Sequence, residues 1–438
     1  MRRKLKRTRN QDRGEMLPAL DTKYPALILK MSPNVIHHGA LAVTRTLGRL
    51  GVPVYAVVED AYAPLALSRY LTKAFVWDSR PTDSESFVKA MSLVAEAIAQ
   101  PAIIIPMDDL SAVFVAENAA NLGRWFVIPR VPPQLPHQLA NKACLLTLCA
   151  QVGIPSARSV VPQSFADVKA FAEGTEFPVV VKAVEQWLPV SNAWCAKVIQ
   201  TREELFSLCA DYNCEETQRL IIQEHIPGDD WICHGYYNSE KNISLTFTGK
   251  KLRGYPPDAG STSLGISVDN ETLRSASEKL LRSVAYSGII DMDWRKDERD
   301  GEFKMLDCNP RVGQNFRMFE NSAGVDVVRA QHLDLSGRRF DNASLREGRL
   351  FTVEPYYALA FLRGLPRSAS KQDAAEYFPH KGKELAWWSG DDPLPFLMMS
   401  VRLVMRVLGK ALGRLWSPLR SRFRRHFRIK KPAVLDAG

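Results

Sequence analysis

Short apolar runs alternate with helical periodicity in the first third of the chain. Strand-like runs begin at Ala26–Leu29 and recur at 54–58, 75–77, 102–105 and 126–128. Between them, apolar residues return at the three- and four-residue spacing of amphipathic helices, at 39–50, 84–99 and 111–121. This alternation predicts a doubly wound parallel sheet. No GxGxxG motif follows the first run, so a dinucleotide site has no support.

The pattern changes after a proline-rich linker at 129–133, where helices mix with strand-like runs near 178–182, 219–224 and 288–309. This mixture predicts an α+β unit. The chain therefore divides into five segments: a basic tail at 1–23, an α/β domain at 24–133, an α+β domain at 134–340 with a small lobe at about 178–230, an extension at 341–392 and a basic segment at 393–438.

The two runs near 288–309 carry the most informative side chains. The dipeptide Asp300-Gly301 between them is a strong hairpin signal, so the runs should pair as antiparallel strands. Side chains alternate between the two faces of a strand. One face of the first strand then presents Asp291, Asp293 and Arg295. If the second strand continues far enough, one of its faces presents Met305, Asp307, Asn309 and Arg311.

Carboxylate and amide oxygens on neighbouring strands can converge on a hard cation. Mg²⁺ prefers such ligands and completes its shell with water and nucleotide phosphates. The rigid donor fork of Arg311 would bind a phosphate or an oxyanion beside the metal. The competing interpretation is a surface hairpin with solvated acids, which the Asn-Pro-Arg-Val-Gly run at 309–313 disfavours.

Asp293, followed by the Asp-Cys-Asn-Pro-Arg-x-Gly run at 307–313, resembles the metal-binding motif of the ATP-grasp superfamily. More specifically, the chain is similar to predicted carboxylate–amine ligases, relatives of carbamoyl-phosphate synthetase and D-alanine–D-alanine ligase. The resemblance runs from about 25 to 337, with a strand ending at Lys182 and a hinge at 220–230 in family order. It implies a pre-ATP-grasp domain, then an ATP-grasp fold that uses ATP and Mg²⁺, with Mn²⁺ as the alternative.

The resemblance also implies roles for individual residues. It implies nucleotide contacts for Lys142, Lys182, Glu224, His225, Ile226 and Asp230. Of these, Lys182 would contact the phosphates, the hinge would hold adenine, and Asp230 would meet the ribose hydroxyls. The implied metal ligands are Asp293, Asp307 and Asn309, with Asp291 as a rival to Asp293 on the same strand face. The family's second ligand is often Glu, whereas Asp307 is one methylene shorter.

Other charged residues could serve the same site. Lys251 and Arg253 precede a run of small residues, and they are candidate catalytic groups beside a closing loop or, equally, an exposed basic turn. Lys197 is a weaker candidate for a phosphate contact. The pair Asp108-Asp109 follows a predicted strand, where it could bind an amine substrate or cap the next helix.

The implied reaction is ADP-forming ligation, in which a carboxylate becomes an acyl phosphate and is joined to an amine. Arg311 would stabilise the intermediates. Phosphoryl transfer requires that the reacting groups be positioned and their charge neutralised, and it does not require a protein nucleophile. Two alternatives stay open: an ATP-grasp enzyme with a thiol or other acceptor, and a non-catalytic ATP-binding scaffold at a membrane. The sequence names neither substrate, and it leaves the oligomeric state open.

The formal net charge of +10 is concentrated in two tails. Residues 1–9 contain six Lys and Arg, and residues 393–438 contain eleven with one acid, so the rest of the chain is mildly acidic. Seven scattered cysteines without a CxxC pair favour a reducing compartment. Neither a signal peptide nor an apolar run of about 18 residues is evident, so the expected location is the cytoplasm.

The basic C-terminal segment predicts an amphipathic helix. Arg402, Arg406, Lys410 and Arg414 recur every four residues opposite apolar positions, and further basic residues continue to 431. This pattern favours an anionic membrane on its inner face, bound through 393–431. The alternative is a helix docked on the enzyme's own core with a solvated basic tail. Nucleic acid is disfavoured because no aromatic stacking platform or recognition module accompanies the charge.

Overall fold

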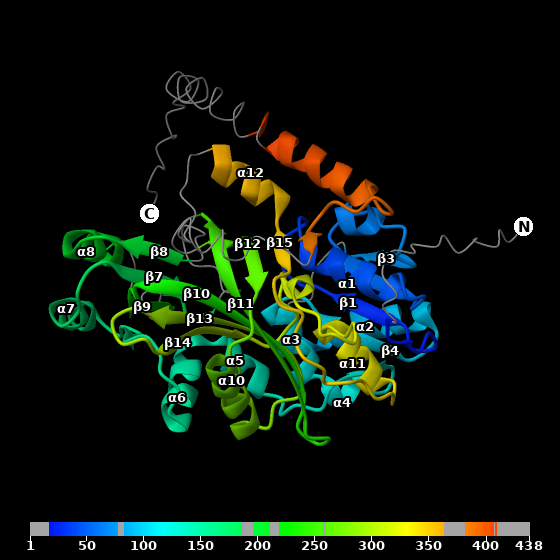
Figure 1. Ribbon diagram of the computed structural model, residues 1–438, viewed down its shortest axis with the longest axis horizontal. Helices are drawn as coiled ribbons and strands as arrows, with labels where there is room; N and C mark the ends of the chain where they lie inside the picture. Colours follow the sequence, from blue (N-terminus) through cyan, green and yellow to red (C-terminus); the bar gives the residue numbers. More distant parts are fainter. Residues whose placement is uncertain are drawn as a thin grey trace, which may run out of the picture.

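The computed structural model describes residues 17–77, 83–185, 187, 196–210, 219–256, 260–362, 382–406 and 408–409. The described chain forms three sheets, and the largest lies between the N-terminal sheet and the sheet of a small lobe (Figure 1). The fold prediction of a parallel-sheet domain followed by a mixed α+β unit is confirmed.

The N-terminal sheet is parallel, with the strand order β3-β2-β1-β4-β5. Its strands are β1 (Ala26–Leu29), β2 (Val54–Val58), β3 (Lys73–Val76), β4 (Ala102–Pro106) and β5 (Phe126–Val127). The connecting helices are α1 (His38–Gly48), the 3-10 turn η1 (Pro64–Leu67), α2 (Ser84–Ile98), α3 (Asp109–Glu117) and α4 (Ala119–Leu122). The predicted helix at 111–121 is thus two helices that meet at Asn118. Because α1 covers one face while α2 and α3 cover the other, the central strands are apolar on both sides.

The small lobe is a four-stranded antiparallel sheet with the order β6-β9-β7-β8. Its elements are β6 (Ser159–Val160), α7 (Phe165–Glu173), β7 (Val179–Ala183), β8 (Ala196–Ile199), α8 (Arg202–Ala210) and β9 (Leu220–Glu224). A capping box between Ser164 and Asp167 begins α7. Phe171 of α7 and Leu205 of α8 pack on Val181 and its neighbours, which closes one face of this sheet.

The large sheet has seven strands, in the order β14-β13-β10-β11-β12-β15-β16. These are β10 (Gly228–Asn238), β11 (Ile243–Tyr255), β12 (Ser261–Ser267), β13 (Gly288–Asp297), β14 (Phe303–Asn309), β15 (Leu350–Thr352) and β16 (Lys383–Leu385). The associated helices are α5 (Leu135–Ala140), α6 (Lys142–Val152), α10 (Glu271–Ser283), η2 (Phe316–Met318), α11 (Val327–Leu335) and α12 (Glu354–Leu362). The segment expected as an extension at 341–392 therefore supplies the last two strands of this sheet.

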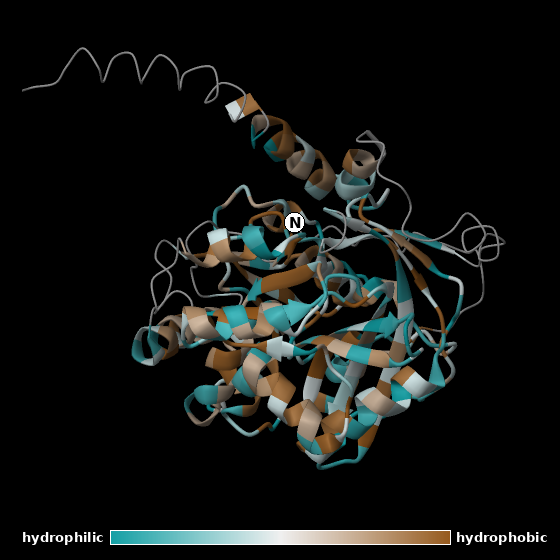
Figure 2. Cartoon of the chain, turned by 90° about the vertical axis from the view of Figure 1, so that its left-hand side faces the viewer, coloured by the Kyte–Doolittle hydropathy of each residue, from teal (hydrophilic) through white to brown (hydrophobic). Residues whose placement is uncertain are grey.

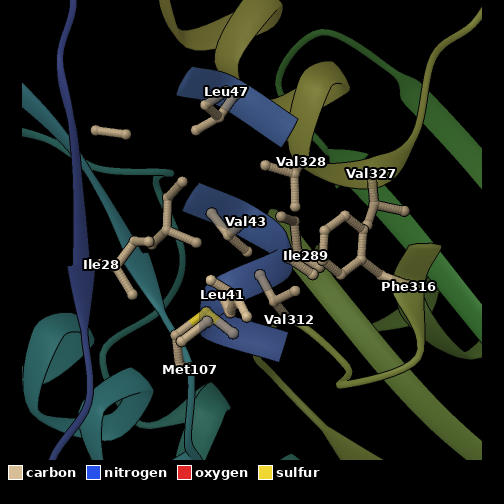
Figure 3. Packing of buried hydrophobic residues seen from close by; sticks show 14 of the residues in the cluster. Ile28, Leu41, Val43, Leu47, Met107, Ile289, Val312, Phe316, Val327 and Val328 are labelled. Carbon is tan, nitrogen blue, oxygen red and sulfur yellow. The ribbon is translucent and has the colours of Figure 1, made fainter. Parts of the chain in front are cut away.

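One apolar core joins the N-terminal domain to the large sheet. Figure 3 shows side chains of β1 and α1 packed against side chains of the hairpin region and α11. The packed residues are Ile28, Leu41, Val43, Leu47, Met107, Ile289, Val312, Phe316, Val327 and Val328. This shared core holds the carboxyl ends of β1 and β4 beside β13 and β14, which fixes where the polar side chains at those ends meet.

A buried ion pair anchors the C-terminal segment to α1. The Asp392 carboxylate accepts from Arg45 Nε at 3.0 Å, from Ser68 Oγ at 2.7 Å and from the Arg69 N–H at 2.9 Å. Arg45 also donates to the Trp387 carbonyl at 2.8 Å. Residues 394–406 then continue as a helix, whereas the predicted continuation from 410 lies outside the described residues. Among the helices of the described chain, none is both long and apolar enough to cross a bilayer.

We expect the Asp392→Asn variant to lower the free energy of unfolding by about 3 kcal/mol, because Arg45 would keep a buried charge without its partner. Urea unfolding of the whole chain measures this change. The matched control is Glu240→Gln, which removes a solvent-exposed pair with Arg130 and should cost under about 1 kcal/mol. Equal effects of the two substitutions would contradict an anchoring role.

Candidate functional site

The predicted hairpin is present, and its register places the acidic residues opposite each other. Asp291 pairs with Asn309, and Asp293 pairs with Asp307. The register shifts between Asp293 and Trp294, because Leu306 is an extra residue on β14. The prediction that Met305 shares a face with Asp307 is therefore wrong.

The bulge also separates the two environments of β14. Met305 lies in the apolar core beneath the sheet, whereas Leu306 lines the cavity above it. The strand ends at Asn309, so Arg311 reaches the site from the loop after β14.

Two lysines from separate elements converge on Asp307. Lys142 Nζ lies 2.8 Å from Asp307 Oδ1, and Lys182 Nζ lies 3.7 Å from Oδ2. Lys142 is the first residue of α6, where the Asn141 side chain caps the helix, and Lys182 lies on β7 of the small lobe. Burial raises the pKa of Asp307, but the two ammonium groups outweigh burial and bring it below the ordinary value. Burial in turn lowers the pKa of Lys182.

Within the described chain, the carboxylate of Asp293 has no partner that offsets its negative charge through a direct contact. It makes neither a hydrogen bond nor an ion pair with the residues that the structure describes. Burial raises the pKa of Asp293 to about 6; Lys251 opposes this rise, while the charges of Asp291 and Asp307 add to it. A partly buried carboxylate beside other carboxylates attracts a cation strongly.

Asp291 instead supports Arg311. One carboxylate oxygen of Asp291 lies 2.9 Å from His234 Nε2, and the other accepts from Arg311 Nη1. Asp109 Oδ1 lies 3.5 Å from Arg311 Nε. Burial disfavours the charged form of Asp291, yet His234 and Arg311 outweigh burial and lower its pKa. Both oxygens of Asp291 have partners, and Asp291 orients the guanidinium of Arg311.

The two acids after β4 have different roles. Asp108 caps α3 through the Ser111 N–H at 2.8 Å and accepts from the N–H groups of Met31 and Ser32 at 2.7 Å each. It therefore shapes the β1–α1 loop. Asp109 is buried beside Arg311, and burial raises its pKa. Of the two predicted interpretations, the structure supports helix capping for Asp108.

The hinge after β9 is braced by side-chain contacts. Glu224 accepts from the Arg158 N–H at 3.0 Å and from Arg299 Nη2 at 3.1 Å. Asp230 on β10 lies 3.5 Å from Arg295 Nε. Glu224, Asp230 and the buried Ile226 all line the same cavity as the hairpin acids.

These elements enclose a polar cavity of about 290 Å³ between the small lobe and the large sheet. Ten of the residues that the sequence indicated for the site line this cavity: Lys142, Lys182, Glu224, Ile226, Asp230, Lys251, Asp293, Asp307, Asn309 and Arg311. Within the described chain, no group of three or more His, Cys, Asp or Glu side chains is arranged to hold a metal. Two carboxylates and an amide oxygen can bind a hard cation if a ligand with its own oxygens completes the shell.

Three predicted residues do not line this cavity. The Arg253 guanidinium lies over the Tyr357 ring, 5.2 Å from its centroid. The pairing register of β11 shifts between Lys251 and Arg253, so the two side chains do not share a face of the strand. Lys197 pairs with Glu204 at 3.2 Å on the surface of the small lobe. His225 lies between two lining residues, but its own side chain is not part of the lining.

Three residues that no sequence motif indicated also line the cavity: His38, Gln314 and Asn315. His38 begins α1 and is buried, and its Nε2 has no hydrogen-bond partner in the described chain. Burial lowers the pKa of His38 to about 4, so the ring is neutral near pH 7. No sequence motif points to this contact. In the structure Gly39 permits it, because a Cβ there would lie 3.0 Å from Gln314 Cα.

No family model matches the chain. Among curated proteins, it is 23% identical over 289 residues to a D-aspartate ligase of Enterococcus faecium (strain Aus0004), covering 63% of this chain and 68% of that protein.

Solved structures give the same result for the fold. The L-amino acid ligase of Bacillus licheniformis superposes with a TM-score of 0.56 at 15% identity, covering 75% of this chain and 79% of that one. The biotin carboxylase domain of Hydrogenobacter thermophilus 2-oxoglutarate carboxylase, solved with MgADP and bicarbonate, also has a TM-score of 0.56 at 15% identity. The match covers 75% of this chain and 74% of that one. The N5-carboxyaminoimidazole synthetase of Staphylococcus aureus, complexed with ADP, has a TM-score of 0.55 at 11% identity. The match covers 77% of this chain and 83% of that one.

The chain has the ATP-grasp fold. The predicted resemblance to carboxylate–amine ligases of this superfamily is confirmed.

We expect Gly313→Ala to destabilise the protein by about 2 kcal/mol, because the added Cβ would lie 2.1 Å from His234 Cε1 and 2.8 Å from Asp291 Cγ. Chemical unfolding measures this cost. Gly390→Ala is the control, since its Cβ would meet no atom within 4 Å. An unchanged Gly313→Ala protein would show that the contacts of His234 and Asp291 are looser than described.

Proposed function

We propose that this chain is an ADP-forming ligase that joins a carboxylate to an amine at the expense of ATP. The observation that carries the proposal is the convergence of two lysines, two carboxylates, an amide and Arg311 on one cavity. Ammonium groups and a hard cation would neutralise the charge of a triphosphate, and a partly buried arginine would stabilise a developing oxyanion. The similarity to a D-aspartate ligase and to an L-amino acid ligase supports the same class of reaction.

The residues present fit a nucleotide and a divalent metal. Lys142 and Lys182 would hold phosphate oxygens, and Asp293, Asp307 and Asn309 would ligate Mg²⁺, or Mn²⁺ in its place. The hinge at 224–226 would hold adenine, and Asp230 would meet the ribose. Bound metal would neutralise charge on the transferred phosphoryl group. Structural neighbours that contain ADP or MgADP support this assignment.

The chain's own residues would then serve two steps. In the first, a substrate carboxylate oxygen bonds to the γ-phosphorus, the bond to ADP breaks, and Lys182 and Lys251 hold the phosphate charge. In the second, the amine nitrogen bonds to the acyl carbon, the bond to phosphate breaks, and the nitrogen loses a proton. Arg311, oriented by Asp291 and Asp109, would stabilise the oxyanion of the second step.

The second candidate function is the same activation followed by transfer to a thiol or another acceptor. Amine transfer is favoured because the curated relative is a D-aspartate ligase and a structural neighbour is an L-amino acid ligase. A silent nucleotide-binding scaffold is disfavoured, since it has no need of Asp293 and Asp307 in one cavity with Arg311. We place the reaction in the cytoplasm, in keeping with free thiols at all five cysteines that the structure describes.

The purified chain should release ADP and phosphate when ATP, Mg²⁺ and a matching amino acid pair are present, and EDTA should abolish turnover. Asp307→Asn should lower turnover at least about 100-fold, because it removes the negative charge of a proposed Mg²⁺ ligand that also pairs with Lys142 and Lys182. Coupled assays against pools of amino acids and small carboxylates measure this, with Glu240→Gln as the control. Release of AMP and pyrophosphate would contradict the acyl phosphate route.

A second experiment separates the two neighbouring acids of β13. Asp293→Asn should remove the Mg²⁺-dependent increase in ADP affinity, since it deletes a proposed ligand. Asp291→Asn should keep that increase and lose turnover instead, because Arg311 would lose its orienting carboxylate. Calorimetric titration of ADP with and without Mg²⁺ distinguishes them. The reverse outcome would make Asp291 the metal ligand.

A further inference from the structure

The C-terminal helix presents an apolar stripe to solvent. Twelve large apolar side chains of the described chain are exposed, and six of them lie on this one helix. They are Leu394, Leu397, Val401, Val404, Met405 and Leu408, which are 50–64% exposed. At about 100° per residue, these positions fall within an arc of about 100°. Figure 2 shows apolar colouring on this helix where it extends from the body of the protein.

The opposite side of the helix is already occupied. Met399 is buried against the core, and Phe396 packs there and against Trp388. Arg402 donates to Asp60 Oδ1 at 2.6 Å and to the Tyr62 carbonyl at 3.1 Å. Together with the Asp392 anchor, these contacts hold the helix in one orientation. The stripe therefore cannot turn inward without breaking the docked face. The docking that one sequence-based alternative expected is present, and the apolar face of the helix stays outside.

The positive charge of residues 402–431 indicates which kind of partner would bind this stripe. Residues 402–431 contain eleven Lys and Arg and no Asp or Glu. A second copy of the chain would bring an equally basic segment to the same place, which repels. An anionic bilayer offers acyl chains for the stripe and headgroups for the cations.

We propose that the stripe of residues 394–408 inserts into the surface of an anionic membrane and fixes the enzyme there. The helix would lie in the interface while the basic residues after it contact headgroups. Trp387, just before the anchor, packs against His38 with ring centroids 6.1 Å apart, and His38 lines the polar cavity. Membrane binding would thus hold the cavity at a fixed orientation to the bilayer. This proposal does not depend on the chemistry of the cavity.

The test is cosedimentation of the full chain with vesicles of phosphatidylcholine alone or mixed with phosphatidylglycerol. We expect binding to the anionic vesicles that weakens with salt, and much weaker binding to the neutral ones. The double variant Val401→Glu, Val404→Glu should weaken anionic binding at least about tenfold, because burial of the stripe is lost. The control Leu93→Glu, Phe165→Glu changes two exposed apolar residues elsewhere by the same charge and should bind as the parent does.

Three results would overturn the proposal. Unchanged binding by the stripe variant would assign vesicle attachment to the basic residues alone. Equal binding to both kinds of vesicle would remove the role of charge. Absence of vesicle binding, with self-association that the stripe variant abolishes in sedimentation velocity, would make the stripe a contact between copies of the chain.

Discussion

The rest of this structure depends on three closely spaced carboxylates of one hairpin, of which Asp291 is buried and the other two are partly buried. Asp291, Asp293 and Asp307 lie on adjacent strands with little solvent around them, and buried charge is costly unless it is paired. Their partners come from outside the hairpin: His234 from β10, Lys142 from α6, Lys182 from the small lobe and Arg311 from the loop after β14. The site therefore exists only when the lobe, the helix and the sheet are packed together. Of the three carboxylates, Asp293 alone has neither a hydrogen bond nor an ion pair with the described residues, and this suits a ligand for a cation.

Irregular strands refine that arrangement. Strict alternation would place Met305 beside Asp307 and Arg253 beside Lys251. The extra residue Leu306 in β14 sends Met305 into the core, and the irregularity in β11 sends Arg253 toward Tyr357. Irregularities of this kind are common beside active sites, where they re-aim a side chain without ending the strand.

The C-terminal segment connects three parts of the molecule. β16 extends the large sheet, the Asp392 anchor binds α1, and the helix that follows turns an apolar stripe outward. Because α1 also supplies His38 to the cavity, the outer helix and the site share one rigid element. The C-terminal segment thus contributes to how the site is held.

Local patterns predicted a large part of this arrangement. The parallel domain, the Asp300-Gly301 hairpin and the motif around Asp293 and Asp307 all follow from interactions within a few residues or from strand periodicity. The same reasoning could not assign Asp291 and Asp293 to different tasks, because both lie on one strand face.

The sequence by itself determined the class of fold, the pairing of the hairpin strands and the charge of the two tails. The tertiary structure alone decided that Asp291 serves Arg311, that His38 enters the cavity from another domain, and that the C-terminal helix docks with its apolar stripe outward. The reason is physical: alternation and helical periodicity are local, whereas pairing of buried charges and burial of one helix face depend on segments that are distant in sequence and meet only when the domains pack.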